Sequence, residues 1–279
     1  MPSIEQNKRA WETGYKWPQE GDEWSVPWGG ADMQWYGSIL PRIHAFVPAN
    51  TILEIAPGFG RWTQFLLHLC KQLSVVDLSP KCIEACRKRF SEYPHVRYYV
   101  NDGKSLAMIP DDSVDFIFSY DSLVHAELDV IESYLLEARR ILKKDGVGFI
   151  HHSNLGEYVR YLALVDSLPP RLRAIALRAG LLDRSLYSTH NHWRAKSMTA
   201  DEFVTLCEQA DLHCTTQEVR TWISRKLIDC YSVFTRRGSV WATPYRIIRN
   251  SSPEAAYLRR LSTCYSKANL IRNSSVSGC

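Results

Sequence analysis

Apolar and polar positions follow two alternating patterns along most of the chain. Short apolar runs predict strands at 52–55, 73–77, 95–100, 114–119, 147–150, 212–220 and 229–236. Apolar residues at helical spacing predict helices at 61–69, 80–90, 129–142 and 199–210. Strands that alternate with helices are typical of a parallel sheet covered on both faces. The pattern therefore predicts an α/β fold.

Two glycines after the first predicted strand make its end suitable for binding a ligand. Gly58 and Gly60 let the main chain approach a ligand closely, and a helix begins directly after them at Arg61. The next strand ends at Asp77, 17 residues beyond Gly60, where a doubly wound fold places the carboxylate that binds ribose hydroxyls. A dinucleotide site would carry a third glycine, but Gly60 is followed by Arg61-Trp62-Thr63. A nucleoside-type cofactor is therefore expected, and NAD is disfavoured.

The acid before this loop completes a recognisable motif. Glu54, the glycine loop and Asp77 together resemble the class I S-adenosylmethionine-dependent methyltransferases, whose first motif is an acid, one residue and Gly-x-Gly-x-Gly. Ala56 stands where the first glycine of that motif is expected. The resemblance covers roughly residues 50–237 and implies a doubly wound, Rossmann-like sheet of seven strands. It also implies S-adenosyl-L-methionine as the cofactor, with a nicotinamide enzyme as the alternative.

Further cofactor contacts follow from the resemblance and from the tryptophan-rich opening. Asp102 follows the third strand, where these enzymes commonly place an acid against the adenine amino group; a turn residue is the alternative. The first 48 residues hold five of the nine tryptophans, either as a satellite core or as a lid whose rings attract a sulfonium cation and stack on sugars. The predicted cofactor-binding residues are Glu54, Ala56, Gly58, Gly60, Asp77, Asp102, Tyr120 and Trp28.

Candidate catalytic residues follow the fourth and fifth strands, at the edge where open α/β sheets bind ligands. Adjacent histidines on a strand point to opposite faces, so at most one of His151 and His152 faces the cofactor. His152 lies nearer the strand's carboxyl end and is the predicted general base, with Asp121 orienting it or the acceptor and His125 as the second choice.

A divalent cation such as Mg²⁺ is a second hypothesis for activating the acceptor. Asp121 and Glu127, with Asp129 nearby, could supply its oxygen ligands. The alternative is that these acids simply favour the start of the following helix.

The acceptor is predicted from a narrower resemblance. The tryptophan-rich opening, the glycine loop and the ends of the fourth and fifth strands are together similar to bacterial sugar and polysaccharide O-methyltransferases. A sugar or glycan hydroxyl is therefore the expected acceptor. A small-molecule or lipid O-methyltransferase and a non-catalytic adenosyl-binding module are the alternatives. No nucleic-acid partner is expected, because the catalytic half is not basic and has no Asn-Pro-Pro-Tyr motif.

Charge and composition divide the chain. We predict an aromatic lid at 1–48, a methyltransferase domain at 49–237 with an acceptor-side insertion at 155–197, and a basic extension at 238–279. The formal net charge is +4, yet residues 236–279 carry eight basic residues and one acid. This extension is expected either to be a solvated, partly disordered tail or to contact an anionic glycolipid, a membrane or nucleic acid.

The remaining composition is ordinary for a globular protein. Eight cysteines without a CxxC pair read as free thiols in a reducing compartment. No apolar run approaches the roughly 20 residues that span a bilayer, and the first residues do not resemble a signal peptide. These features predict a cytoplasmic protein; the oligomeric state stays open.

Overall fold

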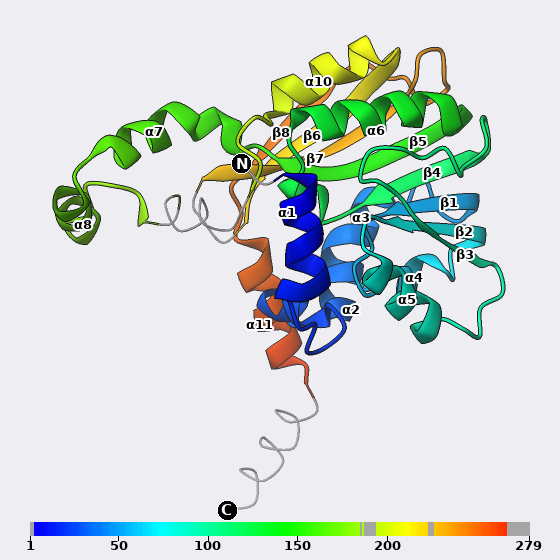
Figure 1. Cartoon of the computed structure of the whole chain (residues 1–279), viewed down its shortest axis with the longest axis horizontal. Helices are drawn as coiled ribbons and strands as arrows, with labels where there is room; N and C mark the ends of the chain where they lie inside the picture. Colours follow the sequence, from blue (N-terminus) through cyan, green and yellow to red (C-terminus); the bar gives the residue numbers. More distant parts are fainter. Residues whose placement is uncertain (1–2, 185, 187–193, 223–225, 267–279) are drawn as a thin grey trace, which may run out of the picture.

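A computed structural model, which describes residues 3–184, 186, 194–222 and 226–266, confirms the α/β class (Figure 1). One eight-stranded sheet has the order β3-β2-β1-β4-β5-β7-β6-β8. Only β7, among the described strands, runs antiparallel to its neighbours β5 and β6. The strands are β1 (Ala49–Ile55), β2 (Cys70–Asp77), β3 (Val96–Val100), β4 (Val114–Ser119), β5 (Leu142–Ser153), β6 (Leu212–Thr221), β7 (Leu227–Arg236) and β8 (Arg246–Asn250).

Helices cover both faces of this sheet and bury it. One face packs against α6 (Leu128–Ile141) and α10 (Ala200–Gln209), and the other against α3 (Leu40–Ile43), α4 (Thr63–Leu66) and α5 (Pro80–Arg89). The central strands are therefore apolar on both sides, which is why they read as continuous runs in the sequence. Helix α4 is shorter than the predicted helix at 61–69, because turns occupy both of its flanks. Ser79 caps α5 by accepting the N–H of Cys82 at 3.3 Å.

The N-terminal segment is more regular than its Gly, Pro and Trp content indicated. It contains α1 (Ile4–Arg9), a π-helical turn η1 (Ala10–Gly14) and a 3-10 helix η2 (Asp22–Trp28) that includes Pro27. Before the first strand, the chain forms α2 (Ala31–Gln34), the π-turn η3 (Trp35–Ile39) and α3. Pro41 lies in the first turn of α3, where its missing N–H is tolerated, and so it does not break the helix.

The expectation of seven strands, with the basic extension outside the fold, is corrected. Strand β8 pairs in parallel with β6, and α11 (Glu254–Cys264) packs against η2 and α2. Glu254 anchors α11 by binding Arg42 at 3.0 Å and Arg220 at 2.6 Å. An exposed edge strand lacks the apolar run that identifies a central one, which explains the error. Residues 267–279 lie outside the described part.

The insertion predicted at 155–197 contains helices; its residues 185 and 187–193 lie outside the described part. It begins with the 3-10 turn η5 (Leu155–Tyr158) and continues through α7 (Val159–Ser167) and α8 (Pro170–Arg178), which project away from the sheet (Figure 1). No helix in the described parts of the chain is long and apolar enough to cross a membrane.

Candidate active site

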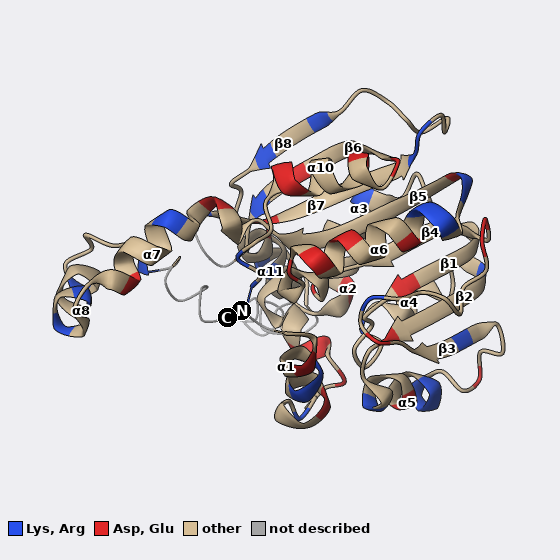
Figure 2. Cartoon of the chain, turned by 45° about the horizontal axis from the view of Figure 1, so that its top comes forward, with Lys and Arg blue, Asp and Glu red and all other residues tan. Residues whose placement is uncertain are grey.

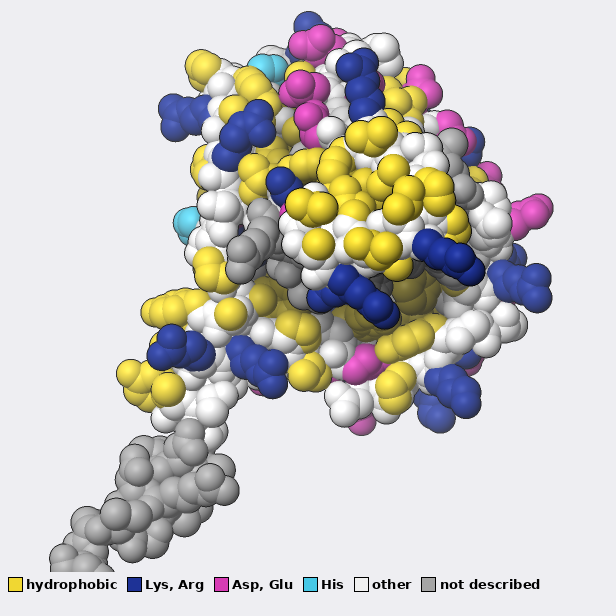
Figure 3. Space-filling model, turned by 90° about the vertical axis from the view of Figure 1, so that its left-hand side faces the viewer, with side chains coloured by type: hydrophobic (Ala, Val, Ile, Leu, Met, Phe, Trp, Pro, Cys, Tyr) yellow, Lys and Arg dark blue, Asp and Glu magenta, His cyan; other side chains and the backbone are white. Residues whose placement is uncertain are grey.

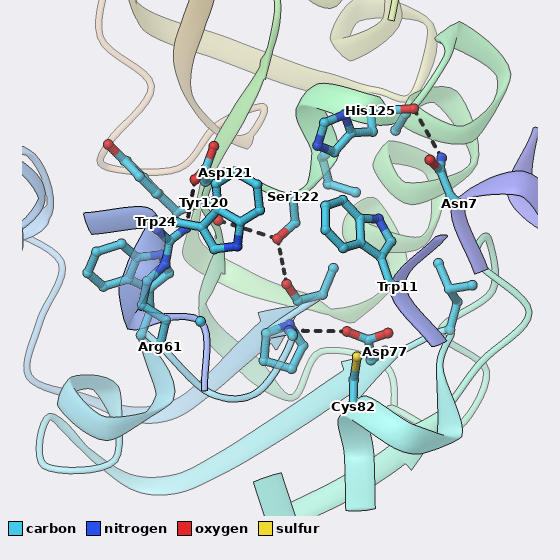
Figure 4. Close-up of a pocket in the computed structure, with 18 of the residues that line it drawn as sticks. Asn7, Trp11, Trp24, Arg61, Asp77, Cys82, Tyr120, Asp121, Ser122 and His125 are labelled. Carbon is cyan, nitrogen blue, oxygen red and sulfur yellow. Dashed lines mark hydrogen bonds and ion pairs between the residues drawn. The ribbon is translucent and has the colours of Figure 1, made fainter. Parts of the chain in front are cut away.

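A cavity of about 590 Å³ lies at the carboxyl ends of β1, β2 and β4, and residues of the N-terminal segment form part of its lining (Figure 4). Its volume is in the range of small-molecule sites. Ala56 and Gly58 line it after β1, Asp77 at the end of β2, and Tyr120 after β4. The predicted edge of the sheet is therefore where the structure has its cavity.

The glycine loop needs the conformational freedom that its sequence offers. Gly58 has a φ of +60°, and a Cβ there would come within 2.7 Å of the ring of Trp17. Ala56 also adopts a positive φ, of 57°. Gly60 has a φ of +90° but faces Phe90 instead of the cavity, where a Cβ would meet the ring at 2.4 Å. Gly60 therefore allows close packing of the loop against α5 and does not contact the ligand space.

Asp77 is the buried carboxylate of the cavity. It accepts the N–H of Ser79 at 2.8 Å and that of Gly58 at 3.3 Å. Burial raises the pKa of Asp77 to about 6, although these N–H groups lower it. A carboxylate offers about four acceptor positions, so Asp77 can accept further hydrogen bonds from hydroxyls of a ligand.

Glu54 is not among the residues that line the cavity, contrary to the prediction. It is buried beneath the loop, where it accepts a hydrogen bond from Thr63 Oγ1 at 2.6 Å. Burial, with a smaller contribution from the charge of Asp77, raises the pKa of Glu54 to about 8. Its role in this structure is to hold the start of α4 beneath the glycine loop.

We expect Glu54→Gln to remove a pH dependence of stability. The folded pKa of about 8 exceeds the ordinary value of 4.5, so the folded state retains a proton that the unfolded state has lost. Stability is therefore highest below pH 4.5 and falls as the pH rises towards 8. Glutamine keeps the acceptor for Thr63 and should raise the free energy of unfolding at pH 8 by a few kcal/mol, on the order of 1.4 per pKa unit. Denaturant unfolding of the wild type and of Glu54→Gln at pH 5 and pH 8 measures this free energy. An equal pH dependence of stability in the two proteins would contradict the prediction.

Asp102 also lies outside the cavity. Its exposed carboxylate accepts the N–H groups of Lys104 and Ser105 at 2.9 and 2.7 Å, and these bonds lower its pKa. The interpretation of Asp102 as a turn residue therefore fits this structure, because an Asp side chain can accept hydrogen bonds from the backbone of its own turn. Gly103 lines the cavity instead, and Ile4 of α1 lies close to it.

His152 is on the wrong face of the sheet to act as the base. It is fully buried, with its ring stacked on Phe203 at 4.4 Å and its Nε2 2.8 Å from Ser232 Oγ. Burial lowers its pKa to about 3. His151 is the histidine on the cavity side, although it does not line the cavity. The prediction that the two histidines face opposite sides of the sheet was correct. The alternation of side chains along a strand does not reveal which of the two faces the cavity.

His151 belongs to a buried polar network that sequence reasoning missed. Its Nδ1 accepts the N–H of Asp121 at 3.1 Å, and its Nε2 lies 3.6 Å from Asp229. Arg194 binds Asp229 through two hydrogen bonds of 2.7 and 2.9 Å. Burial would raise the pKa of Asp229, but Arg194 and His151 hold it well below its usual range. The network thus links the strand-end loop after β4 to Arg194, which lines the cavity.

Asp121 lines the cavity and is fixed on its other side by Arg61. Asp121 Oδ2 accepts a 2.7 Å hydrogen bond from Arg61, which also lines the cavity (Figure 4). Nη1 of Arg61 is buried and has no hydrogen-bond partner among the described residues. The position of Arg61 directly after the glycine loop was the available signal for its role.

The three acids considered for a cation do not form a cluster. Asp121 binds Arg61, Glu127 accepts the N–H of Ser197 at 3.1 Å, and Asp129 binds Lys104 at 2.6 Å. Within the described residues there is no group of three or more His, Cys, Asp or Glu side chains that could hold a metal ion. The divalent-cation hypothesis therefore finds no ligand set here.

Among the described residues, His125 is the histidine that lines the cavity. It follows β4 in the 3-10 turn η4 (Leu123–His125) and is half-buried. Its ring lies 5.5 Å from that of Trp11, and its carbonyl accepts a 3.2 Å hydrogen bond from Asn7 (Figure 4). Two N-terminal residues therefore position this loop.

The tryptophans of the opening divide between the cavity and the core. Trp11, Trp17 and Trp24 line the cavity, where a lid would lie. Trp28 also lines it but is only 1% exposed, with its ring 4.6 Å from that of Trp222. Trp35 is buried in the core beneath the sheet. Tryptophans of the same N-terminal segment thus line the cavity and pack in the core.

Comparison with known proteins agrees with this architecture. Residues 52–146 match a family model described as a methyltransferase domain. Nodulation protein S of Bradyrhizobium diazoefficiens is 30% identical over 81 residues, which are 29% of this chain and 39% of that protein. A non-reducing polyketide synthase of Penicillium roqueforti is 33% identical over 106 residues, 34% of this chain and 4% of that protein. The chain thus spans less than half the length of these curated relatives.

Solved structures show the same fold. A SAM-dependent methyltransferase of Leishmania major has a TM-score of 0.55 at 10% identity and covers 83% of this chain and 82% of its own. A protein of Pyrococcus horikoshii has a TM-score of 0.50 at 18% identity, and the match covers 74% of this chain and 93% of that protein. The matched domain contains the glycine loop, Asp77 and Tyr120. Residues 52–146 therefore match a methyltransferase domain, and the chain as a whole has the fold of these solved structures.

Proposed function

We propose that the protein transfers a methyl group from S-adenosylmethionine to a hydroxyl of a sugar or polysaccharide. The observation that carries this proposal is one cavity lined by two kinds of residue. Gly58 of the glycine loop and buried Asp77 line it, and so do tryptophans with Arg61, Asp121 and His125. The first set suits a nucleoside, and the second suits a polar, ring-shaped acceptor.

The residues of the cavity fit the cofactor. Asp77 would accept hydrogen bonds from the ribose hydroxyls, and the Gly58 N–H that it already accepts holds it at the glycine loop. The buried Nε1 of Trp28 and Nη1 of Arg61 lack partners within the described residues, so they can donate to ligand oxygens. When bound, S-adenosylmethionine supplies an activated methyl group on a sulfonium. The aromatic faces of the lid attract such a cation.

The protein's own task is then to hold the acceptor and remove its proton. A sugar hydroxyl is a weak acid, so a neutral histidine near it assists as general base. Because His152 packs on the opposite layer, we propose His125 for this role. Asp121, fixed by Arg61 and by the N–H that it donates to His151, would orient the acceptor hydroxyl.

The alternative functions differ from this proposal either in the acceptor or in whether the protein catalyses a reaction at all. A non-catalytic adenosyl-binding module would have an acceptor side without polar groups, whereas Glu23, Asp121 and Arg194 line this one. A small-molecule or lipid acceptor would use the same general base and the same cofactor-binding residues. A hydroxyl of any of these acceptors is therefore compatible with the proposed machinery.

Methyl-labelled cofactor tests the acceptor class. The protein should transfer label to glycans with free hydroxyls and not to the same glycans after chemical methylation. Mass spectrometry of the product would locate the added methyl group. Label that enters only lipids or aromatic small molecules would overturn the sugar assignment and leave methyl transfer intact. Absence of transfer with bound cofactor would favour the non-catalytic module.

A further inference from the structure

The two helices of the insertion form an arm that projects from the body of the protein. We define the α7–α8 arm as residues 159–184; Figure 1 shows it extending away from the sheet. Its base is held by Leu162, which packs with Leu155 and Ile228 in a small cluster that also contacts Trp222. Helix α8 buries none of its residues. A nine-residue helix without tertiary packing is marginal in water, so its outer face is suited to contact another surface.

The arm exposes apolar side chains on α7, on α8 and directly after α8. The exposed side chains include Leu164, Leu172, Ile175 and Leu181, which are 65%, 56%, 61% and 78% exposed. Figure 3 faces this end of the molecule and shows apolar side chains gathered there with Lys and Arg around them. Contiguous exposed apolar residues of this kind mark a site of interaction with a protein or a membrane.

The charge of the arm distinguishes between these partners. It carries five arginines and two acids, a net charge of +3: Arg160, Arg171, Arg173, Arg178 and Arg184 against Asp166 and Asp183. Figure 2 shows the positive charge concentrated on α8. Arg173 lies 3.3 Å from Asp166 and ties the two helices together. A second copy of the arm would bring like charges together, whereas anionic headgroups would complement them.

We propose that the α7–α8 arm docks on an anionic lipid surface. Its leucines and isoleucine enter the interface, and its arginines lie at the headgroups, as in helices that lie in the plane of a membrane. Trp222 contacts the base of the arm and also lines the cavity. Docking therefore holds the cavity near the headgroup layer. This inference concerns binding alone and does not depend on the identity of the methyl acceptor.

Vesicle co-sedimentation tests the proposal with the full chain. Wild-type protein should bind vesicles of equal parts phosphatidylcholine and phosphatidylglycerol more tightly than vesicles of phosphatidylcholine alone, and added salt should weaken the binding. Leu172→Asp with Ile175→Asp should weaken binding at least about tenfold, because both side chains leave the apolar face. Both positions are exposed, so the double variant should retain the wild-type melting temperature.

Val240→Asp is the matched control, because Val240 is 78% exposed on a turn outside the arm. It should bind vesicles as the wild type does. Equal binding by the wild type and the double variant would overturn the proposal and place any lipid contact elsewhere, such as the basic C-terminal extension. Absence of wild-type binding would overturn it as well. A concentration-dependent dimer that the double variant loses, without vesicle binding, would identify a second copy as the partner instead.

Discussion

His125→Ala is expected to lower kcat by about 10²–10⁴-fold, the usual contribution of a general base. His125 lines the cavity after β4 and lies on the same loop as Asp121. The substitution keeps the backbone carbonyl that Asn7 binds, so the loop should stay in place. Affinity for the adenosyl ligand should change little, because Asp77 and the glycine loop are untouched. Steady-state kinetics with labelled cofactor, and calorimetry on the same variant, separate the two effects.

His152→Ala provides the control for this prediction. His152 stacks on Phe203 and binds Ser232 on the layer opposite the cavity. Its removal should destabilise the fold by about 2–4 kcal/mol through a buried cavity and a lost hydrogen bond, with kcat retained below the melting temperature. Unchanged kcat in His125→Ala, or a selective loss of kcat in His152→Ala, would refute the proposed base.

Asp77→Asn should weaken the adenosyl ligand by about 10–100-fold, since a neutral amide replaces a charged acceptor in hydrogen bonds worth about 1.5–3 kcal/mol each. The amide oxygen can still accept the N–H of Ser79, which limits damage to the loop. Isothermal calorimetry with S-adenosylhomocysteine measures the change. Asp102→Asn is the matched control, because the carboxylate of Asp102 only serves its own turn.

The raised pKa of the Asp77 carboxylate predicts that binding of the adenosyl ligand depends on pH. Asp77 has a raised pKa of about 6 in the ligand-free protein. As the pH falls through this value, the carboxylate gains a proton and loses the charge that strengthens hydrogen bonds from ribose hydroxyls. Affinity should therefore fall between about pH 7 and pH 5 in the wild type and stay level in Asp77→Asn. A parallel decline in both proteins would assign the titration to another group.

The order of strands and helices could be predicted because burial on both faces makes β1, β2 and β4 continuous apolar runs. Gly58 and Asp77 could be placed for a similar reason, since the ends of parallel strands meet at one edge of the sheet. Strand β8 could not be predicted, because an edge strand with little burial carries no such pattern.

The polar network illustrates what a sequence does not reveal. Arg61, Asp121, Arg194 and Asp229 come from four separate segments, and only the folded chain brings them together. Nothing local distinguishes Arg194 from the other arginines of the insertion. Glu54 and Asp102, which were predicted to bind the cofactor, do not line the cavity, and each carboxylate binds a nearby group that a motif does not specify.

Binding of the cofactor tests the central claim most directly. The ligand-free protein should be titrated by calorimetry with S-adenosylhomocysteine and, separately, with NAD. The cavity described by Asp77 and the glycine loop predicts one site for the adenosyl ligand, weakened in Asp77→Asn, and no measurable heat with NAD. Tight binding of NAD without binding of the adenosyl ligand would contradict the account.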